Sequence, residues 1–311
     1  MTPRFVPITN YALAGLSIAS EVPLPASVRV DSDVQTPAQI AIKYGRVPSS
    51  LPSATSFPEA QYDGNALLID IPEAARFLIR EGNEIVVDPA PSASEGDISA
   101  FLLGTVFGAL CHQRGIVPLH ASALDISTGC IAFAGASGAG KSTLAAALKI
   151  RGHQIISDDV CFLRRDEADE ILVWPGIGRI RLWEDAIEAL GYDASTVERE
   201  FRGLNKFILP VVPDRDPREP RRLRRVYQLE TAAAGEAPNI VRLQGAPTIE
   251  LLIPNVYRLT FAEYMGSKPA VFALCAVIAR QVPVYRFRRQ LGFDALARAI
   301  DCLEAHLADV L

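Results

Sequence analysis

The sequence predicts an α/β protein whose main domain is preceded by a small β-rich N-terminal module. The first 95 residues contain short β-prone runs separated by proline, serine and glycine, such as Ile40–Tyr44 and Ala66–Ile71. From Cys130 onward the order becomes an apolar strand, a glycine-rich turn, a helix and a second strand, which is typical of an α/β core. We therefore expect a module over residues 1–95 and a second domain, ending in helices, over residues 96–311.

The end of the module should lead into a helix. Glu84–Val87 is a further β-prone run, whereas Pro48–Pro58 is expected to be a loop because proline and serine interrupt any regular pattern. Asp97 is the expected N-cap of a helix that stops near Gly115. Its apolar residues recur at three- and four-residue spacing, which indicates a buried face: Ile98, Phe101, Leu102, Val106 and Leu110.

The second domain carries alternating strand and helix patterns. Strands are expected over Cys130–Ala134 and Gln154–Ile156, with a helix over Ser142–Ile150 between them. Near the C-terminus a strand over Pro283–Phe287 lies between two helices, the second of which begins after Asp294.

The charge balance limits the classes of partner. The formal net charge is −5, so broad binding to nucleic acid is not expected. Basic residues are concentrated in Arg215–Arg225, which also contains two prolines. A solvated insertion is the favoured interpretation of this stretch, and recognition of an acidic peptide or a phosphate is the alternative.

The compartment can be inferred from cysteines and apolar runs. The five cysteines are widely spaced without a CxxC pair, which favours reduced thiols in a cytosolic protein. The apolar stretch Tyr11–Ala19 fits a signal peptide poorly, because it is short and only Arg4 supplies a basic flank. No run of 18 or more apolar residues is present, so no transmembrane helix is expected. We expect a cytoplasmic protein without membrane contact.

The strongest motif is GASGAGKS, which fits the G-x-x-x-x-G-K-[ST] pattern of a phosphate-binding P-loop. The glycines let successive N–H groups point at phosphate oxygens, and the following helix adds its positive end. Lys141 should contact the β- and γ-phosphates, and Ser142 should ligate Mg²⁺. The predicted cofactors are ATP and Mg²⁺, bound by Gly135, Ser137, Gly138, Ala139, Gly140, Lys141, Ser142 and Thr143.

Three further polar residues are expected near this loop. Asp158 and Asp159 follow a short strand, and ligands in α/β sheets bind at the carboxyl ends of strands. Neighbouring strand residues point to opposite faces, so one aspartate could hold the metal while the other accepts a proton from a hydroxyl. A pair of turn or cap aspartates is the structural alternative. His120 precedes the strands that lead to the loop, and its clustering with these groups favours a functional role.

Other P-loop classes fit less well. The segment from Asn205 begins like the guanine-reading N-K-x-D motif, but Ile208 stands where the aspartate would be. The chain has no LSGGQ-like segment of transporter ATPases, and the aspartates come too soon for a distant Walker B strand. The spacing favours a small P-loop kinase of unusual layout.

These residues together resemble the HPr serine kinase/phosphorylase family. The matching stretch runs from Leu119-His120 through the loop at Gly135–Thr143 to the Arg-Gly-His and Asp-Asp motifs in Arg151–Val160. More narrowly, the chain is similar to the HPr kinase-related proteins of lasso-peptide clusters through His112–Leu124, Trp174–Trp183 and Val282–Phe287. The resemblance implies an HPr kinase C-terminal-like P-loop domain.

The resemblance also implies roles for individual residues. Asp159 would be the general base toward a serine, supported by His120, and Asp158 and Ser142 would belong to the metal shell, with Lys141 holding ATP. The family's L-E-I-R-G-like signature supplies a glutamate to the metal, but the corresponding segment here has none. That departure leaves the metal shell and any reverse phosphorylase activity open. Basic character and position make three residues candidates for stabilising the transferred phosphate: Arg179, Arg181 and Lys206.

We therefore predict an ATP- and Mg²⁺-dependent kinase that phosphorylates a peptidyl serine, in the narrowest form the C-terminal serine of a lasso-peptide precursor. A nucleotide-binding regulatory or assembly module without transfer is the first alternative, and a small-molecule kinase is the second. The HPr enzymes are hexamers, so the resemblance leaves a homo-oligomer open.

Overall fold

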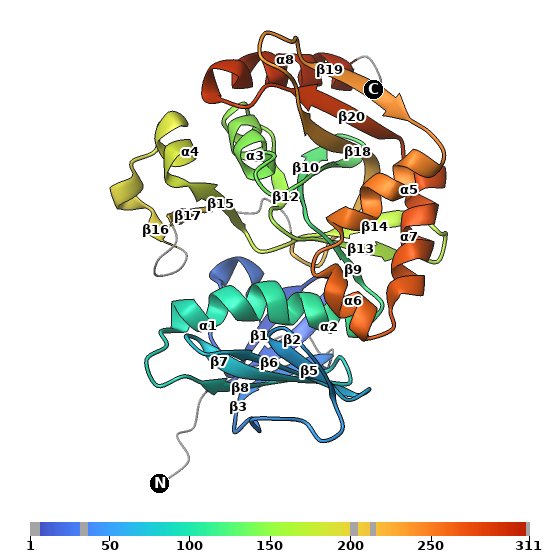
Figure 1. The fold of residues 1–311 in the computed structure, drawn as a ribbon. Helices are drawn as coiled ribbons and strands as arrows, with labels where there is room; N and C mark the ends of the chain where they lie inside the picture. Colours follow the sequence, from blue (N-terminus) through green and yellow to red (C-terminus); the bar gives the residue numbers. More distant parts are fainter. Residues whose placement is uncertain (1–6, 32–36, 200–204, 212–215, 309–311) are drawn as a thin grey trace.

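The computed structural model describes residues 7–31, 37–199, 205–211 and 216–308 and has a mixed α/β architecture built on three sheets. An eight-stranded sheet made by the N-terminal residues lies at one end, and a nine-stranded sheet with its helices forms the other (Figure 1). A three-stranded sheet lies at the side of the second part. None of the described helices is long and apolar enough to cross a membrane.

The N-terminal sheet has the strand order β1-β2-β3-β8-β7-β6-β5-β4. The apolar stretch considered above as a signal peptide forms its first hairpin, closed by Ala14 and Gly15, which both have positive φ. The prediction of a loop over Pro48–Pro58 is wrong near its end, because Thr55–Phe57 form strand β4. The strands are β1 (Thr9–Leu13), β2 (Leu16–Ser20), β3 (Ile40–Tyr44), β4 (Thr55–Phe57), β5 (Ala60–Tyr62), β6 (Ala66–Ile71), β7 (Ala75–Arg80) and β8 (Glu84–Pro89).

A continuous helical rod covers one face of this sheet. It consists of α1 (Glu95–Phe101), a π-helical turn (Leu102–Val106) and α2 (Phe107–Gln113). The N-cap is Ser94 rather than the predicted Asp97, which instead completes a capping box from the third position. The predicted apolar stripe is confirmed, since its residues share one core cluster with the N-terminal strands. The domain boundary at residue 95 stays a prediction. The helix that begins there packs against the N-terminal sheet.

The nine-stranded sheet places the functional loop. Its strands β11, β18 and β20 run parallel, so their carboxyl ends lie at the same edge of the sheet. The remaining pairings are antiparallel. The strands are β9 (Val117–Leu119), β10 (Ala121–Ile126), β11 (Gly129–Ala134), β12 (Ile155–Ser157), β13 (Cys161–Arg165), β14 (Ile171–Trp174), β18 (Arg221–Thr231), β19 (Asn239–Leu243) and β20 (Val284–Arg289).

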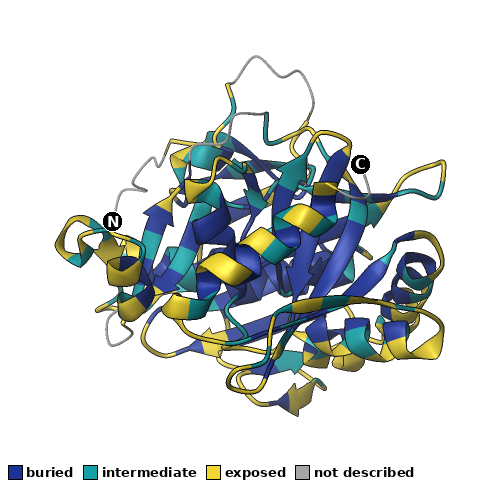
Figure 2. Ribbon diagram, turned by 90° about the horizontal axis from the view of Figure 1, so that it is seen from above, coloured by how far each residue is buried: buried dark blue, intermediate teal, exposed yellow. Residues whose placement is uncertain are grey.

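Helices cover both faces of this parallel core, with their outer sides exposed (Figure 2). α3 (Lys141–Ile150) and α8 (Phe293–Ala308) bury apolar side chains against one face. α5 (Ala246–Leu252), α6 (Leu259–Tyr264) and α7 (Lys268–Gln281) enclose a second cluster with the other face. The strand–loop–helix order predicted around GASGAGKS is present as β11, the loop and α3.

The basic stretch Arg215–Arg225 was expected to be a solvated insertion, but this is wrong for its second half. From Arg221 onward these residues form the start of the central strand β18. Leu223 is buried and Arg225 is 6% exposed, while Arg221 pairs with Asp125 at 2.7 Å. Residue 215 lies outside the described part of the chain. The arginines obscured a strand because their partners come from distant segments.

The small sheet has the order β15-β17-β16, with β15 (Arg179–Trp183), β16 (Glu198–Arg199) and β17 (Lys206–Pro210). Its buried side chains, such as Ile180 and Leu209, join the cluster beneath α3 and α4 (Glu184–Ala189). Alternate residues on β15 and β17 are less buried and form the opposite face of the sheet.

Candidate active site

The loop after β11 is shaped by glycines in conformations that other residues rarely adopt. Gly138 and Gly140 have φ values of 82° and 76°. Gly140 is the N-cap of α3, and a Cβ on it would lie 2.6 Å from the Arg289 guanidinium. The loop therefore requires glycine here both for its backbone and for the close approach of an arginine.

Lys141 begins α3 and is folded back over the loop. Its ammonium donates to the carbonyl oxygens of Gly135 at 2.8 Å and Ala136 at 3.1 Å. The side chain is buried, and this burial lowers its pKa below the ordinary value. In this position the ammonium closes the loop and lines the adjoining cavity.

Asp158 lies behind the loop and is buried, with 8% of its surface exposed. One carboxylate oxygen accepts from Ser122 Oγ at 2.6 Å, and the other accepts the Arg181 backbone N–H at 3.0 Å. Burial raises its pKa, while the Ser122 and Ser142 hydroxyls and the Arg181 amide favour the ionised form. The Ser142 hydroxyl and the Asp158 carboxylate are thus neighbouring oxygen donors.

Asp159 adopts a different conformation from its neighbour. Strand β12 ends at Ser157, so both aspartates lie in the following turn rather than on the strand, and Asp159 has a φ of 68°. This left-handed conformation is uncommon outside glycine, asparagine and aspartate. Its carboxylate contacts Arg181 Nη1 at 2.5 Å and lies 3.6 Å from His120 Nε2.

The charges around Asp159 determine its ionisation. Burial works against the ionised form, but Arg181, followed by His120 and Lys206, outweighs it and holds the pKa of the Asp159 carboxyl below its usual value. The pKa of His120 is lowered to about 4 by burial and by nearby Lys141. At neutral pH the imidazole is therefore uncharged beside an ionised carboxylate.

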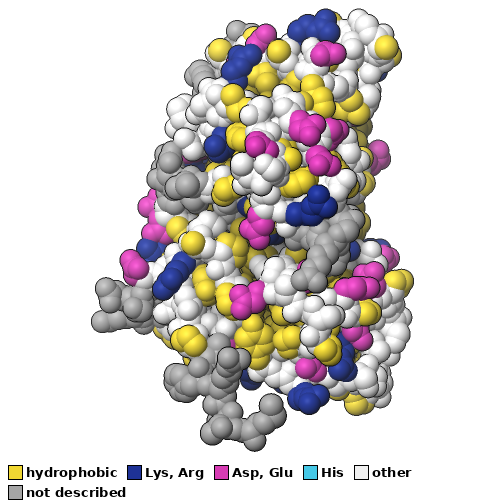
Figure 3. All heavy atoms as spheres, turned by 90° about the vertical axis from the view of Figure 1, so that its left-hand side faces the viewer, with side chains coloured by type: hydrophobic (Ala, Val, Ile, Leu, Met, Phe, Trp, Pro, Cys, Tyr) yellow, Lys and Arg dark blue, Asp and Glu magenta, His cyan; other side chains and the backbone are white. Residues whose placement is uncertain are grey.

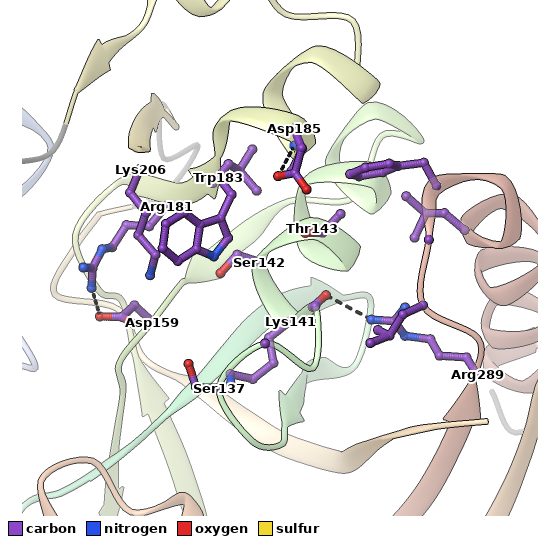
Figure 4. Close-up of a pocket in the computed structure, with 18 of the residues that line it drawn as sticks. Ser137, Lys141, Ser142, Thr143, Asp159, Arg181, Trp183, Asp185, Lys206 and Arg289 are labelled. Carbon is purple, nitrogen blue, oxygen red and sulfur yellow. Dashed lines mark hydrogen bonds and ion pairs between the residues drawn. The ribbon is translucent and has the colours of Figure 1, made fainter. Parts of the chain in front are cut away.

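These groups surround one cavity of about 270 Å³ (Figure 4). Arg181, Lys206 and Trp183 line one side and come from the small sheet, with the Lys206 ammonium 5.0 Å from the Trp183 ring. Ser137, Lys141, Ser142 and Thr143 line it from the loop and the start of α3, and Arg289 approaches from the other side. The remaining lining is largely apolar and comes from α4, the segment after β20 and α8: Ala186, Leu291, Phe293 and Leu296.

Arg289 was not among the residues predicted from the sequence. It ends β20, and its guanidinium donates to the carbonyls of Ala139 at 2.8 Å and Gly140 at 3.1 Å. Only 3% of it is exposed, and burial lowers its pKa to about 10. No carboxylate among the described residues forms a salt bridge with it. A buried cation of this kind beside a P-loop is suited to a phosphate.

Asn255 is a second residue that the sequence did not indicate. Its side-chain oxygen accepts the Gly135 N–H at 2.8 Å, and its backbone oxygen accepts the His120 N–H at 2.6 Å. The amide group in turn donates to Gln228 and Leu251. Asn255 therefore ties the start of the loop to His120. Arg289 had one sequence signal, its place just beyond a predicted strand, whereas Asn255 had none.

The structure brings most of the predicted site residues together. His120, Asp159, Arg181 and Lys206 line the same cavity as the loop residues Ser137, Gly138, Gly140, Lys141, Ser142 and Thr143. Gly135, Ala139 and Asp158 support it from behind through the hydrogen bonds above. Arg179 is the exception, because it lines a separate groove. The chemical roles of all these residues remain predictions.

The donor set fits a magnesium nucleotide. Mg²⁺ is commonly held by one or two protein oxygens together with phosphates and water. The adjacent Ser142 hydroxyl and Asp158 carboxylate provide such oxygens. Within the described ranges no group of three or more His, Cys, Asp or Glu side chains could hold a metal by itself.

Comparison with known proteins adds one structural likeness. No protein-family model matches the sequence, and no curated protein matches it. Among solved structures, the chain is similar to the HPr(Ser) kinase/phosphatase from Coxiella burnetii, with 16% sequence identity and a TM-score of 0.33. The match covers 62% of this chain and 97% of that chain. A TM-score of 0.33 is too low to support a shared function.

Proposed function

We propose that the protein is an ATP- and Mg²⁺-dependent kinase that transfers the γ-phosphate to a serine hydroxyl of a peptide. The observation that carries the proposal is the position of Asp159, which faces the P-loop across one cavity and is paired with Arg181. A module that only senses ATP has no need for an ionised carboxylate at this place. Phosphoryl transfer needs one to orient an attacking hydroxyl.

The cationic groups suit the two ends of the reaction. Lys141, Arg289 and the loop N–H groups would bind the phosphates, while Arg181 and Lys206, which line the cavity beside Asp159, would stabilise the transferred phosphate. Arg181 contacts Asp159 directly, so it can hold this carboxylate ionised and move toward the transferred group as negative charge develops there. The main contribution of these residues is positioning and charge stabilisation, as is usual for phosphoryl transfer.

The protein groups that would hold Mg²⁺ are Ser142 and Asp158. When bound, the ion would neutralise part of the charge on the phosphates. His120 is neutral at physiological pH and can exchange a hydrogen bond with Asp159 or with the acceptor hydroxyl. A peptidyl serine, and in its narrowest form the C-terminal serine of a lasso-peptide precursor, is the acceptor favoured by the motif order described above.

The proposal is tested with labelled ATP, Mg²⁺ and serine peptides, including the C-terminal peptide of any precursor encoded beside this protein. Phosphate is located by mass spectrometry, and small alcohols are assayed in parallel. We expect the wild type to modify a serine, and Asp159→Asn to bind ATP while losing at least about 100-fold in turnover. Asp301→Asn on the exposed face of α8 is the matched control and should keep full activity.

Other results would point elsewhere. ATP binding without transfer to any acceptor would favour the sensing or assembly module. Transfer only to small alcohols would favour the small-molecule kinase. Full transfer by Asp159→Asn would show that this carboxylate is not the base.

A further inference from the structure

The exposed face of the small sheet connects the candidate active site with a separate groove. In this antiparallel sheet, Trp183 is paired with Lys206, Arg181 with Ile208, and Arg179 with Pro210. Paired residues lie on the same face, and alternate residues along each strand share it. All six side chains therefore belong to one face, opposite the buried residues of the same strands.

The two ends of this face line different cavities. Trp183, Arg181 and Lys206 line the phosphate cavity at one end. Arg179, Ile208 and Pro210 line the groove at the other end, together with Glu198 of β16. The two end pairs are four residue steps apart along β15, which corresponds to about 13 Å at the rise of a β-strand.

The groove itself is mostly apolar and has a volume of about 570 Å³. The N-terminal part of the chain also contributes to its lining, through Pro25, Ala26 and, on α1, Ala100. Ile177 and Val211 complete the apolar lining. Figure 3 shows the corresponding side of the molecule, on which hydrophobic side chains surface among dispersed charged ones.

We propose that this groove and the sheet face are the acceptor channel, which binds an extended peptide whose apolar side chain enters the groove. This proposal rests on the proposed kinase function. The continuity of the face with the Asp159 cavity is the reason for choosing a peptide, since a small acceptor would need no contacts so far from the reacting hydroxyl. An extended chain rises at most about 3.3–3.6 Å per residue, so the apolar side chain lies about four residues from the phosphorylated serine.

The groove also explains the position of Arg179. Of the three basic residues proposed for phosphate contact, Arg179 is the one that lines the groove instead of the phosphate cavity. In the channel its contribution is to the peptide, beside Glu198, rather than to the transferred phosphate. This sheet thus divides its basic residues between chemistry and recognition.

The test uses the whole chain and a positional-scanning library of peptides with one fixed serine. Each other position carries leucine, alanine, aspartate or lysine in turn. The variant Ala26→Trp places a large side chain at an exposed position of the groove wall, and Ala234→Trp makes the same change in an exposed turn that lines neither cavity. Ile208→Ser is a second variant that removes apolar surface from the groove without filling it.

We expect the wild type to prefer leucine at one position three to five residues from the serine. Ala26→Trp and Ile208→Ser should raise the peptide KM at least tenfold with kcat and ATP affinity within about twofold, and Ala234→Trp should behave as wild type. No leucine preference, or an unchanged preference in both groove variants, would overturn the channel. Transfer to no peptide by the wild type overturns the kinase function instead. The channel is then tested by measuring peptide affinity in the presence of a non-hydrolysable ATP analogue. Equal peptide affinities of Ala26→Trp and Ala234→Trp would show that the groove does not bind the peptide.

Discussion

The Arg181 guanidinium lies 2.5 Å from the carboxylate of Asp159, while the backbone N–H of the same residue donates to Asp158. One residue of the small sheet therefore holds both aspartates of the turn after β12. This arrangement couples the position of the small sheet to the geometry of the candidate active site.

Replacing this arginine should impair turnover more than nucleotide binding. In Arg181→Gln, Asp159 loses its main cationic partner, so the carboxylate is less well oriented and the transferred phosphate loses a charge. We expect kcat for peptide phosphorylation to fall roughly 100-fold, with ATP affinity changed less than about fivefold. Arg179→Gln, on the same strand and face, is the matched comparison: because Arg179 lines the groove and not the phosphate cavity, its loss should act on the peptide KM and leave kcat within about twofold. Equal losses of kcat in the two variants would contradict the role of Arg181.

Arg289 should contribute to the binding of nucleotide phosphates. Charge-assisted hydrogen bonds are worth about 1.5–3 kcal/mol, so Arg289→Gln should weaken ATP and ADP binding roughly 10- to 100-fold while adenosine binding changes little. Isothermal titration measures the three affinities. The neighbouring Arg288→Gln is the control, because Arg288 pairs with Glu236 outside the cavity. An equal loss for adenosine and ATP would mean that Arg289 acts through the structure of the loop instead.

Asn255 should stabilise both the fold and the start of the P-loop. Asn255→Ala leaves the buried Gly135 N–H and the Gln228 side chain without their partner, at a cost of about 1–3 kcal/mol in the free energy of unfolding. Denaturant unfolding measures this loss, and ATP affinity should fall with it because the loop is less restrained. Asn239→Ala, at an exposed position of β19, should change neither quantity. Unaltered ATP affinity in Asn255→Ala would show that the hydrogen bond from the Gly135 N–H is not needed to hold the loop in its ATP-binding shape.

His112 should make the fold sensitive to mild acid. It is buried on α2 with Nε2 2.9 Å from the Tyr257 carbonyl, and burial lowers its pKa below 6.5. As the pH falls below about 6.5, the unfolded chain takes up a proton that the folded chain does not, so stability decreases by at most about 1.4 kcal/mol per pH unit. Above pH 6.5 this contribution is constant.

The variant His112→Gln retains a donor for Tyr257 but cannot titrate. Thermal unfolding of both proteins between pH 5 and 8 should show a smaller acid-induced decrease in Tm for the variant. Parallel curves for the two proteins would mean that other groups account for the pH dependence. His120 is present in both proteins, so its own titration does not affect the difference.

Local patterns in the sequence predicted much of the secondary structure around the site. The alternation of apolar residues gave β3 and β6 with their observed bounds, and the apolar stripe before Gly115 gave the helix that covers the N-terminal sheet. The largest error was at β18. Its arginines suggested solvent, whereas ion pairs such as Arg221 with Asp125 satisfy them within the central sheet. Local composition cannot reveal partners that are almost a hundred residues away.

The sequence by itself determined the phosphate-binding loop, because glycine conformations and the start of a helix are local properties of GASGAGKS. It also placed Asp158 and Asp159 a short distance further along the chain. Only the tertiary structure decided what surrounds them. Arg289 and Asn255 reach the loop from segments more than a hundred residues away, and Arg179 is separated from Arg181 although both lie on one strand face. Charge and hydrogen bonding act through space, so a site assembled across two sheets is specified by packing as much as by its motifs.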